Sequence, residues 1–349
     1  MSVSVPALVL EGAAERFVRG AVERRDPGPR DIVIEIAYAG ICHSDIHAGR
    51  GEWGDIFTFP LTPGHEITGT VAAIGSEVTS RAVGDRVGVG CFVDSCGECA
   101  PCSAGEQQYC ERGTVFTYGS QGRDGVNTQG GYSTSIVVDE RYVLGIPDAL
   151  PLDQAAPLLC AGVTLYAPLT RFGAGPGKKV AIVGLGGLGH MGVKIAHALG
   201  AEVTVISRTL AKREDALRLG AVDYLASSDP EALAAAAERF DLIVNTVSAP
   251  IDVDAIAGLV RLGGAIVFVG MPPEPLSFDV YSLTSKRRIL AGSNIGGIPE
   301  TQEMLEFCAR NELGADIEIV TADEVSDTWD RVVAGDVRYR AVIDIASLS

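Results

Sequence analysis

The sequence predicts an α/β protein of two domains, one a doubly wound parallel sheet covered by helices and the other mostly β. Three observations support this fold class. The chain has 349 residues, which is long enough for two hydrophobic cores. Residues 1–150 contain short β-like runs broken by Gly and Pro. From about residue 178, short apolar strands alternate with helix-like segments, as in a parallel sheet with helices on both faces.

The first domain is predicted from its β-like runs. These are rich in β-branched residues and end at Gly or at an acidic pair. They include IVIEIAYAG (32–40), ITGTVAAIG (67–75) and YSTSIVVDE (132–140). The frequent Gly and Pro between them indicate an irregular, mostly β domain.

The second domain is predicted from strands that are apolar throughout, namely KVAIVG, EVTVIS, VDYLA, LIVNT and AIVFVG. Strands without polar alternation indicate burial on both faces. After about residue 295 a helix-like segment and a last strand-like run, RAVIDI, follow, and this tail is able to return to the first domain. We therefore expect residues 1–150 and 295–349 to form one domain and 151–294 the other.

The charge of the chain argues against two classes of partner. Twenty-eight basic and forty-five acidic residues give a net charge of −17, which disfavours nucleic acid and anionic membranes. No run of 18 apolar residues and no signal-type N-terminus is present, so we expect a cytoplasmic protein. Thiols stay reduced there, and clustered cysteines are then better explained by metal binding or catalysis than by disulfides.

A glycine-rich turn links the first strand of the second domain to a helix. KVAIV runs directly into GLGGLG (184–189). Gly184 permits a tight turn, Gly186 lets the backbone approach a pyrophosphate, and Gly189 allows close packing of helix on strand. The strand–turn–helix context predicts a Rossmann-type dinucleotide site, with Gly187 and Leu188 at the helix start; the alternative is a turn without a ligand.

The end of the next strand favours NADP(H) over NAD. EVTVI is followed by Ser207, Arg208 and Thr209, where an NAD enzyme usually has the acid that binds the ribose 2′-OH. No acid is present there, and Arg208 and Lys212 can pair with a 2′-phosphate. The alternative for Arg208 is a solvated surface charge.

Four of the eight cysteines lie in CGECAPCSAGEQQYC (96–110). Cys96, Cys99 and Cys102 recur every third residue, so one loop can direct three thiolates at one point, and Cys110 can complete a tetrahedron. Four thiolates fill the coordination sphere of Zn²⁺ and leave no position for substrate, as in a structural site. Disulfides and an iron–sulfur cluster are the alternatives.

A second set of possible ligands is scattered along the chain: Cys42, His65, Glu66 and Cys160. Two thiolates and one imidazole would leave a vacant position on zinc, as in a catalytic site, and Asp45 could orient a ligand. Spacing alone does not assemble this set, because a single His or Cys is more often a packed core residue.

Seven segments, taken together and in order, resemble the zinc-dependent medium-chain alcohol dehydrogenases, and most of all the cinnamyl-alcohol-dehydrogenase-type aldehyde reductases. They are CHSDIH, PGHEITG with VGDRVGVG, CGECAPCSAGEQQYC, TQGGYS, CAGVTLYAPL, the GLGGLG turn and DVRYRAVID. The resemblance covers nearly the whole chain. It implies a GroES-like catalytic domain and a Rossmann domain that binds the cofactor.

The resemblance also implies two zinc ions per chain. The catalytic ligands that it implies are Cys42, His65 and Cys160, with Glu66 able to exchange onto the metal. The structural ligands that it implies are Cys96, Cys99, Cys102 and Cys110, within a lobe at 91–112.

The remaining site residues follow from the same resemblance. Ser44 and His47 match the hydroxyl and imidazole of a proton relay that also uses the cofactor ribose. The cofactor contacts that it implies are Thr164, the 184–189 turn, Ser207, Arg208, Lys212, Val247, Gly270, Ser293, Ile295 and Arg340.

The activity implied is hydride transfer between NADP(H) and a primary alcohol or aldehyde, in a homodimer. Candidate pocket walls are Trp53, Phe57, Phe92, Tyr118 and Ile295, which suit an aromatic or medium-chain substrate. Residues 113–127 resemble nothing that can be placed. The alternatives are an NAD-dependent polyol-type dehydrogenase of the same superfamily, an inactive member that binds only dinucleotide, and a zinc-ribbon protein that binds nucleic acid.

Overall fold

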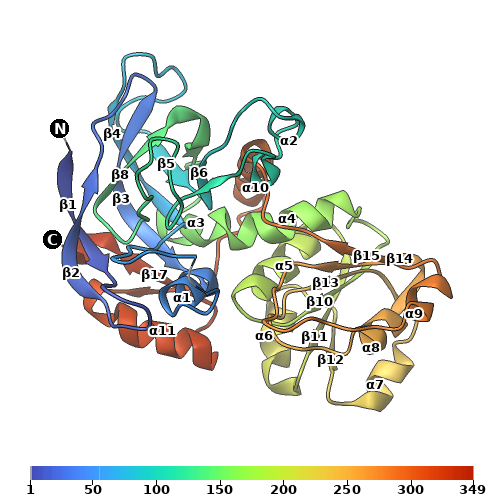
Figure 1. Ribbon diagram of the computed structural model, residues 1–349. Helices are drawn as coiled ribbons and strands as arrows, with labels where there is room; N and C mark the ends of the chain where they lie inside the picture. Colours follow the sequence, from blue (N-terminus) through green and yellow to red (C-terminus); the bar gives the residue numbers. More distant parts are fainter. Residues whose placement is uncertain (1, 55, 349) are drawn as a thin grey trace. The chain divides into compact units, whose positions relative to one another are not determined.

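The computed structural model describes residues 2–54 and 56–348, which form two compact units (Figure 1). The first unit comprises the chain up to Cys160 and from Gly296 onward. The second unit is Ala161–Ile295.

The segment 151–160, which the sequence assigned to the second domain, belongs to the first unit. It contains α3 (Leu152–Ala155) and η3 (Ala156–Leu159). The Thr68 hydroxyl donates a hydrogen bond to the Leu152 carbonyl at 2.9 Å, and the Leu158 and Leu159 side chains are buried. Because these side chains pack in the first unit, that unit extends to Cys160, beyond the boundary predicted at residue 150.

The first unit is organised around a large mixed sheet with the strand order β16-β17-β3-β4-β5-β9, and β8 also pairs with β3. Its strands are β3 (Asp31–Ile41), β4 (Ile67–Ile74), β5 (Arg86–Val89), β8 (Ser135–Asp139), β9 (Leu144–Gly145), β16 (Ile317–Val320) and β17 (Arg340–Asp344). β17 pairs antiparallel with β3, so that Val342 lies opposite Gly40. The C-terminal strand thus returns to the first unit.

Smaller elements surround this sheet. Two strand pairs are β1 (Val3–Val9) with β2 (Val18–Arg24) and β6 (Phe92–Asp94) with β7 (Val115–Phe116). The helices and 3₁₀ turns are α1 (His43–Gly49), α2 (Ala100–Ser103), η1 (Gln107–Tyr109), η2 (Glu140–Tyr142), α10 (Ile298–Arg310), η5 (Ala322–Glu324), α11 (Val325–Ala334) and η6 (Ile345–Leu348). The β-rich character predicted for this part of the chain is confirmed.

The second unit is a parallel sheet with the strand order β12-β11-β10-β13-β14-β15. Its strands are β10 (Lys179–Val183), β11 (Glu202–Ser207), β12 (Asp223–Ala226), β13 (Phe240–Asn245), β14 (Val260–Phe268) and β15 (Ile289–Gly292). Its helices are α4 (Ala161–Arg171), α5 (Gly187–Ala198), η4 (Leu210–Lys212), α6 (Arg213–Arg218), α7 (Pro230–Ala235), α8 (Val253–Gly258) and α9 (Tyr281–Thr284). The doubly wound fold class is confirmed.

The strand order reverses direction at β10, which has β11 on one side and β13 on the other. The central strands of this sheet are buried on both faces. Val180 of β10, Val203 of β11 and Ile243 of β13 have no exposed surface. In such sheets ligands bind beyond the carboxyl ends of the strands at the point of reversal. The glycine-rich turn follows β10 at that point.

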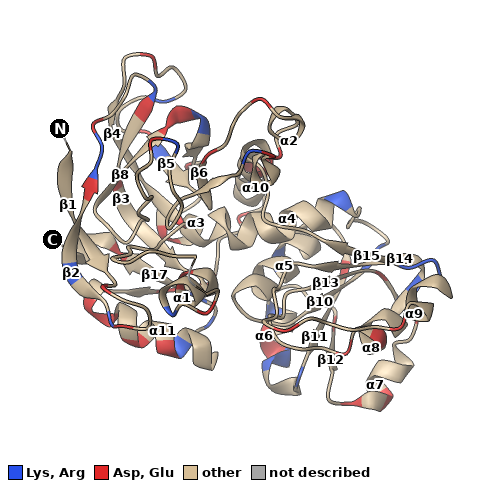
Figure 2. Ribbon diagram, viewed as in Figure 1, with Lys and Arg blue, Asp and Glu red and all other residues tan. Residues whose placement is uncertain are grey.

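In the described part of the chain, no helix is both long and apolar enough to cross a membrane. Acidic and basic residues are interspersed along the outer helices, as α11 illustrates (Figure 2). Arg331 of this helix pairs with Glu318, and its Asp330 pairs with Arg50.

Candidate active site and metal centres

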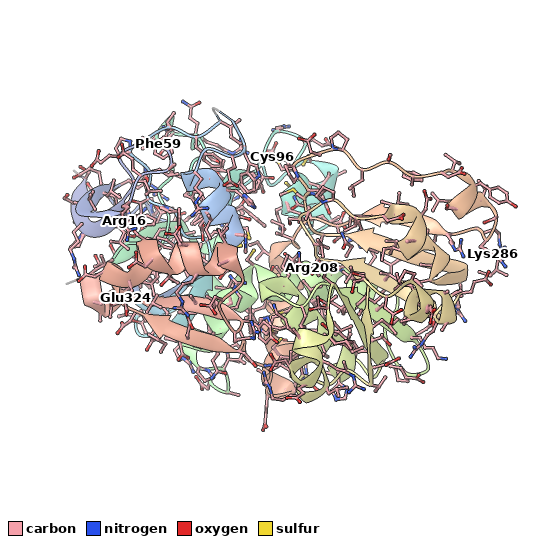
Figure 3. The ribbon with its side chains drawn as sticks, turned by 90° about the horizontal axis from the view of Figure 1, so that it is seen from below. Arg16, Phe59, Cys96, Arg208, Lys286 and Glu324 are labelled. Atoms are coloured by element: carbon pink, nitrogen blue, oxygen red, sulfur yellow. The ribbon has the colours of Figure 1, made fainter. Side chains whose placement is uncertain are left out.

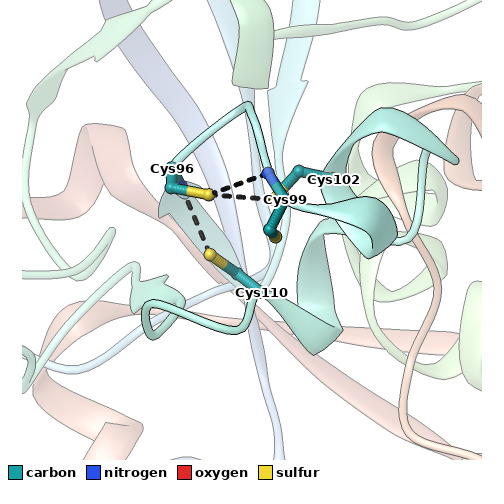
Figure 4. A group of neighbouring side chains, drawn as sticks. All are labelled: Cys96, Cys99, Cys102 and Cys110. Atoms are coloured by element: carbon teal, nitrogen blue, oxygen red, sulfur yellow. Dashed lines mark hydrogen bonds between the residues drawn. The ribbon is translucent and has the colours of Figure 1, made fainter.

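The four clustered cysteines converge within the first unit (Figure 4). The sulfur atoms of Cys96, Cys99, Cys102 and Cys110 all lie within 4.8 Å of one another. Gly97, with φ of +74°, allows the chain to turn sharply between the first two cysteines. The loop geometry thus brings together the ligand set that the spacing predicts.

Backbone N–H groups stabilise the thiolate form in this cluster. Cys96 Sγ accepts bonds from the amides of Glu98 and Cys99 at 3.5 and 3.4 Å, and Cys110 Sγ accepts from the Cys96 amide at 3.3 Å. The bond from Glu98 is the largest of the effects that lower the pKa of Cys96 to about 6. Burial raises the pKa of Cys102 to about 11, so this thiol keeps its proton at neutral pH when no metal is bound. A metal ion that binds here displaces that proton. Four sulfur donors with amide support fit a structural Zn²⁺.

The scattered residues also converge, and all of them lie in the first unit. The ligand atoms of Cys42, His65, Glu66 and Cys160 lie within 4.8 Å of one another. The sulfur atoms of Cys42 and Cys160 are 4.0 Å apart. Cys42 follows β3, His65 and Glu66 precede β4, and Cys160 follows η3. Three distant segments meet, which is why no local pattern reveals the set.

Asp45 anchors the imidazole of this set. Its carboxylate is fully buried and accepts from His65 Nδ1 at 2.9 Å. The amides of Cys42 and Gly64 and the hydroxyl of Tyr132 donate to the same carboxylate at 3.0, 3.2 and 3.2 Å. Burial lowers the pKa of His65, but the charges of Asp45 and Cys91 and the hydrogen bonds with Asp45 and Cys42 together raise that pKa well above its usual value. His65 Nε2 remains for a metal.

Glu66 is held by a buried arginine. Arg340 Nη2 donates to both carboxylate oxygens of Glu66 at 2.7 Å and to the Ile41 carbonyl at 2.8 Å. Burial raises the pKa of Glu66 to about 8, and the Arg340 charge opposes this rise. A Cβ on Gly40 would lie 2.0 Å from Glu66 Oε2, so this glycine makes room for the carboxylate. The family resemblance predicts Arg340 as a cofactor contact, and its side chain here donates to Glu66 and Ile41.

The donor chemistry of this second group fits a catalytic zinc. With Glu66 bound to Arg340, the donors that remain are the Cys42 and Cys160 sulfurs and the His65 imidazole, which leaves one of four positions vacant. The hydrogen bond between the two sulfurs lowers the pKa of Cys42 and raises the pKa of Cys160. Cys42 is therefore the sulfur that more readily supplies a thiolate.

The short helix α1 carries Ser44 and His47. They are three residues apart and so share one face of the helix. His47 Nδ1 contacts the Glu52 carboxylate, and the Glu52 amide donates to the His47 carbonyl at 2.9 Å. Glu52 was not anticipated from the sequence. The signal available was an acid five residues after His47, but only the turn that follows α1 brings it back to the ring.

Residues 113–127, which the sequence left unplaced, supply Tyr118. The Tyr118 ring lies 5.8 Å from the His65 ring and stacks on Phe57 at 6.2 Å, and Phe57 lies 6.1 Å from Trp53. These three aromatic residues, predicted as pocket walls, form one group beside His65. Phe92 instead packs against Tyr142 with an edge-on geometry.

The glycine turn of the second unit has the geometry of a phosphate site. Gly184 has φ of +92°, and a Cβ on Gly189 would lie 2.0 Å from the Gly184 carbonyl oxygen. Gly187 and Leu188 begin α5, and Gly186 caps it. A Cβ on Gly186 would meet no atom within 4 Å. The backbone there is open to an approaching pyrophosphate at the helix N-terminus.

Two basic residues flank this turn. Arg208 follows the last residue of β11, Ser207, and is exposed (Figure 3). Lys212 Nζ donates to the Leu185 carbonyl at 2.9 Å, which holds the ammonium group against the glycine turn. The arrangement suits a phosphate on the ribose 2′ position.

The other positions predicted to contact the cofactor are separated along the second unit. Val247 and Gly270 are adjacent, because a Cβ on Gly270 would lie 2.5 Å from the Val247 carbonyl oxygen. The Ser293 amide donates to the Phe268 carbonyl at 3.0 Å. Ile295 has φ of +41°, and Thr164 is buried in α4.

Comparisons with known proteins identify the family of this chain. Residues 28–148 match the family described as alcohol dehydrogenase GroES-like domain, and residues 187–310 match zinc-binding dehydrogenase. The chain is 57% identical over 346 residues to "NADP-dependent alcohol dehydrogenase C 1" of Mycolicibacterium smegmatis, covering 99% of both chains. It is 50% identical to "Aldehyde reductase YahK" of Escherichia coli, covering 94% of each.

Among solved structures, a cinnamyl alcohol dehydrogenase of Sorghum bicolor superposes with a TM-score of 0.96. The two share 41% sequence identity, and the match covers 99% of this chain and 98% of the other. The resemblance drawn from the sequence motifs is confirmed. The chain belongs to the zinc-type alcohol dehydrogenase family.

Proposed function

We propose that this chain interconverts primary alcohols and aldehydes with NADP(H) as the hydride carrier, and that it accepts aromatic and medium-chain aliphatic substrates. The observation that carries the proposal is the ligand set of Cys42, His65 and Cys160, with Glu66 held by Arg340. Such a set leaves a coordination position for a substrate oxygen. The relatives named for NADP-dependent alcohol dehydrogenase and aldehyde reductase support it.

The two metal groups have different roles in this proposal. The four-cysteine cluster offers no vacant position and serves stability. At the second group, bound zinc supplies a Lewis acid for the substrate oxygen, and bound NADP(H) supplies or accepts the hydride. The protein itself contributes the two thiolates and the imidazole oriented by Asp45.

Ser44, His47 and Glu52 form the proposed route for the proton. The Ser44 hydroxyl would accept the proton lost by the alcohol as it gives up its own, and the imidazole of His47 would take that proton toward solvent, with a ribose hydroxyl of bound NADP(H) between the two side chains as the family resemblance implies. Glu52 holds His47 at Nδ1, which leaves Nε2 to receive the proton. The His47 side chain is 29% exposed and that of Glu52 is 46% exposed, so the route ends at the surface.

Replacing His47 by alanine is expected to slow alcohol oxidation about a hundredfold, because the proton loses its acceptor. The pH dependence of kcat should change, because the proton then has to leave by another route, while zinc content stays that of the wild type. Glu52→Gln should cost less and should have no added effect once His47 is alanine, as expected for residues that act in series. An unchanged rate and pH profile in His47→Ala would refute this route.

The choice of NADP(H) rests on Arg208 and Lys212 beside the glycine turn. Arg208→Ala is expected to raise the KM for NADP about tenfold or more and to leave the KM for NAD nearly unchanged, because only NADP carries a 2′-phosphate. Steady-state rates with both cofactors measure this. Lys194→Ala, on α5, is the control lysine outside this pair. Equal losses for NADP and NAD in Arg208→Ala would contradict the assignment.

A homodimer through the β15 edge of the parallel sheet completes the proposal. β15 ends the strand order, and Ile289 on it is 47% exposed. Met271, Val280 and Tyr281 nearby in the sequence are each more than half exposed. An uncovered sheet edge with apolar neighbours is suited to pairing with a second copy. Sedimentation velocity tests this.

One experiment tests the whole function. Initial rates are measured over a panel of aromatic and aliphatic aldehydes and alcohols, with NADPH, NADP, NADH and NAD, alongside metal analysis. We expect aldehyde reduction with NADPH, weaker rates with NADH, and two zinc ions per chain. Faster turnover of polyols with NAD than of aldehydes with NADPH would identify a polyol-type dehydrogenase instead.

A further inference from the structure

The Asp45 carboxylate receives hydrogen bonds on both oxygens. Oδ1 accepts from His65 Nδ1 and from the Gly64 amide, and Oδ2 accepts from the Cys42 amide and from the Tyr132 hydroxyl. Three of these donors lie at or beside a predicted ligand in the sequence. Tyr132 is the exception, because it comes from a segment that supplies no ligand.

The Tyr132 side chain is completely buried. Backbone hydrogen bonds hold the segment that carries it in place. Residues 130–132 run beside 62–64 and make consecutive bonds to them. The Gly130 amide donates to Thr62 O at 2.6 Å, Gly131 to Gly64 O at 2.9 Å and Tyr132 to Pro63 O at 3.0 Å. The segment that carries the hydroxyl is thus joined to the segment that leads into His65.

Arg24 clamps the same segment from the other side. Its guanidinium is buried, and it donates to the Gln129, Gly130 and Ser135 carbonyls at 2.6, 2.7 and 2.9 Å. It also donates to the Ser133 hydroxyl at 2.7 Å. A buried cation with several backbone acceptors leaves this segment little freedom to shift.

We propose that Tyr132 is a positioning residue for the catalytic metal. Its hydroxyl fixes the rotation of the Asp45 carboxylate, so that Asp45 holds the Nδ1–H of His65 and directs Nε2 to the metal. The proposal rests on the ligand assignment made above. Without the hydroxyl, one oxygen of a buried carboxylate loses a donor, and Asp45 can rotate away from His65.

The test is the rate at which the catalytic metal leaves the protein. Zinc release from the purified holoenzyme to a chromogenic chelator is followed, and the catalytic phase is the one that Cys160→Ser lacks. Tyr132→Phe keeps the ring and its packing but removes the hydroxyl. We expect release in the catalytic phase to be about three- to tenfold faster, below the 10- to 100-fold typical of losing a residue that contacts the ligand itself.

Two comparisons separate this role from a general loss of stability. In an Asp45→Ala background, Tyr132→Phe should add no further acceleration, because the hydroxyl acts through Asp45. Tyr142→Phe is the matched control, since it removes a buried hydroxyl that bonds Ser95 instead. It should leave the catalytic phase unchanged. If Tyr132→Phe yields little folded protein, Ser133→Ala, which loosens the Arg24 clamp, supplies the same comparison.

Several outcomes would overturn the proposal. These are an unchanged catalytic phase in Tyr132→Phe, equal acceleration of both zinc ions, and further acceleration in the Asp45→Ala background. If the wild type and Cys160→Ser release zinc with the same phases, the catalytic metal site itself is refuted, and this proposal with it. The failure of the inference and that of the proposed function are thus distinguishable.

Discussion

Cys160→Ser is expected to lower turnover at least about a thousandfold, because a hydroxyl is a poor substitute for a thiolate on zinc and the Lewis acid is lost with the metal. Zinc content should fall from two ions per chain to one. The remaining ion should be that of the four-cysteine cluster, which does not include Cys160. Metal analysis by atomic absorption and the rate of NADPH oxidation with an aldehyde measure both effects.

Cys308→Ala is the matched control for this experiment. Cys308 is also buried, but its thiol lies against Met304 Sδ at 3.6 Å within α10 and outside both ligand groups. This variant should keep both zinc ions and most of the activity. A Cys160→Ser protein with two zinc ions and the wild-type rate would show that the second ligand group is not a metal site.

Arg340→Met should destabilise the first unit by about 3–5 kcal/mol, the usual cost of leaving a buried carboxylate without its partner. Glu66 is fully buried, and Arg340 Nη2 binds both of its oxygens. Both tryptophans, Trp53 and Trp329, lie in the first unit, so tryptophan fluorescence during urea unfolding reports on this unit.

The double variant Glu66→Gln with Arg340→Met provides the control. Because it removes the charge together with its partner, most of the stability should return. If the single and double variants were equally destabilised, the loss would come from packing or from the Ile41 contact, and the ion pair would not be its cause.

The fold was predictable because its signals are local. Apolar strands alternating with helices identified the parallel sheet, and the GLGGLG turn identified its ligand-binding end. The boundary at 150 was wrong by one short segment, since residues 151–160 look like the start of a helical domain. The side chains of 155–160 are nevertheless buried in the first unit, and burial is a property of the tertiary fold rather than of the segment.

The two ligand groups differ in how far sequence alone can reach. Cys96, Cys99, Cys102 and Cys110 lie in one loop, so spacing was enough to predict convergence. Cys42, His65 and Cys160 converge only when three segments meet, and the family resemblance was needed to name them. Contacts such as those between Glu52 and His47 depend on one turn after α1, which no composition rule specifies.

Because β17 pairs with β3, the large sheet of the first unit cannot be completed until residues 340–344 have been synthesised. Arg340 leaves the ribosome long after Glu66, because 273 residues lie between them in the sequence. Until then Tyr38–Ile41 has an open backbone edge and Glu66 lacks its cation. The contiguous second unit can fold earlier, as nascent domains generally do. A chain cut short before residue 340 would therefore present an exposed strand edge and a buried Glu66 carboxylate without its cation.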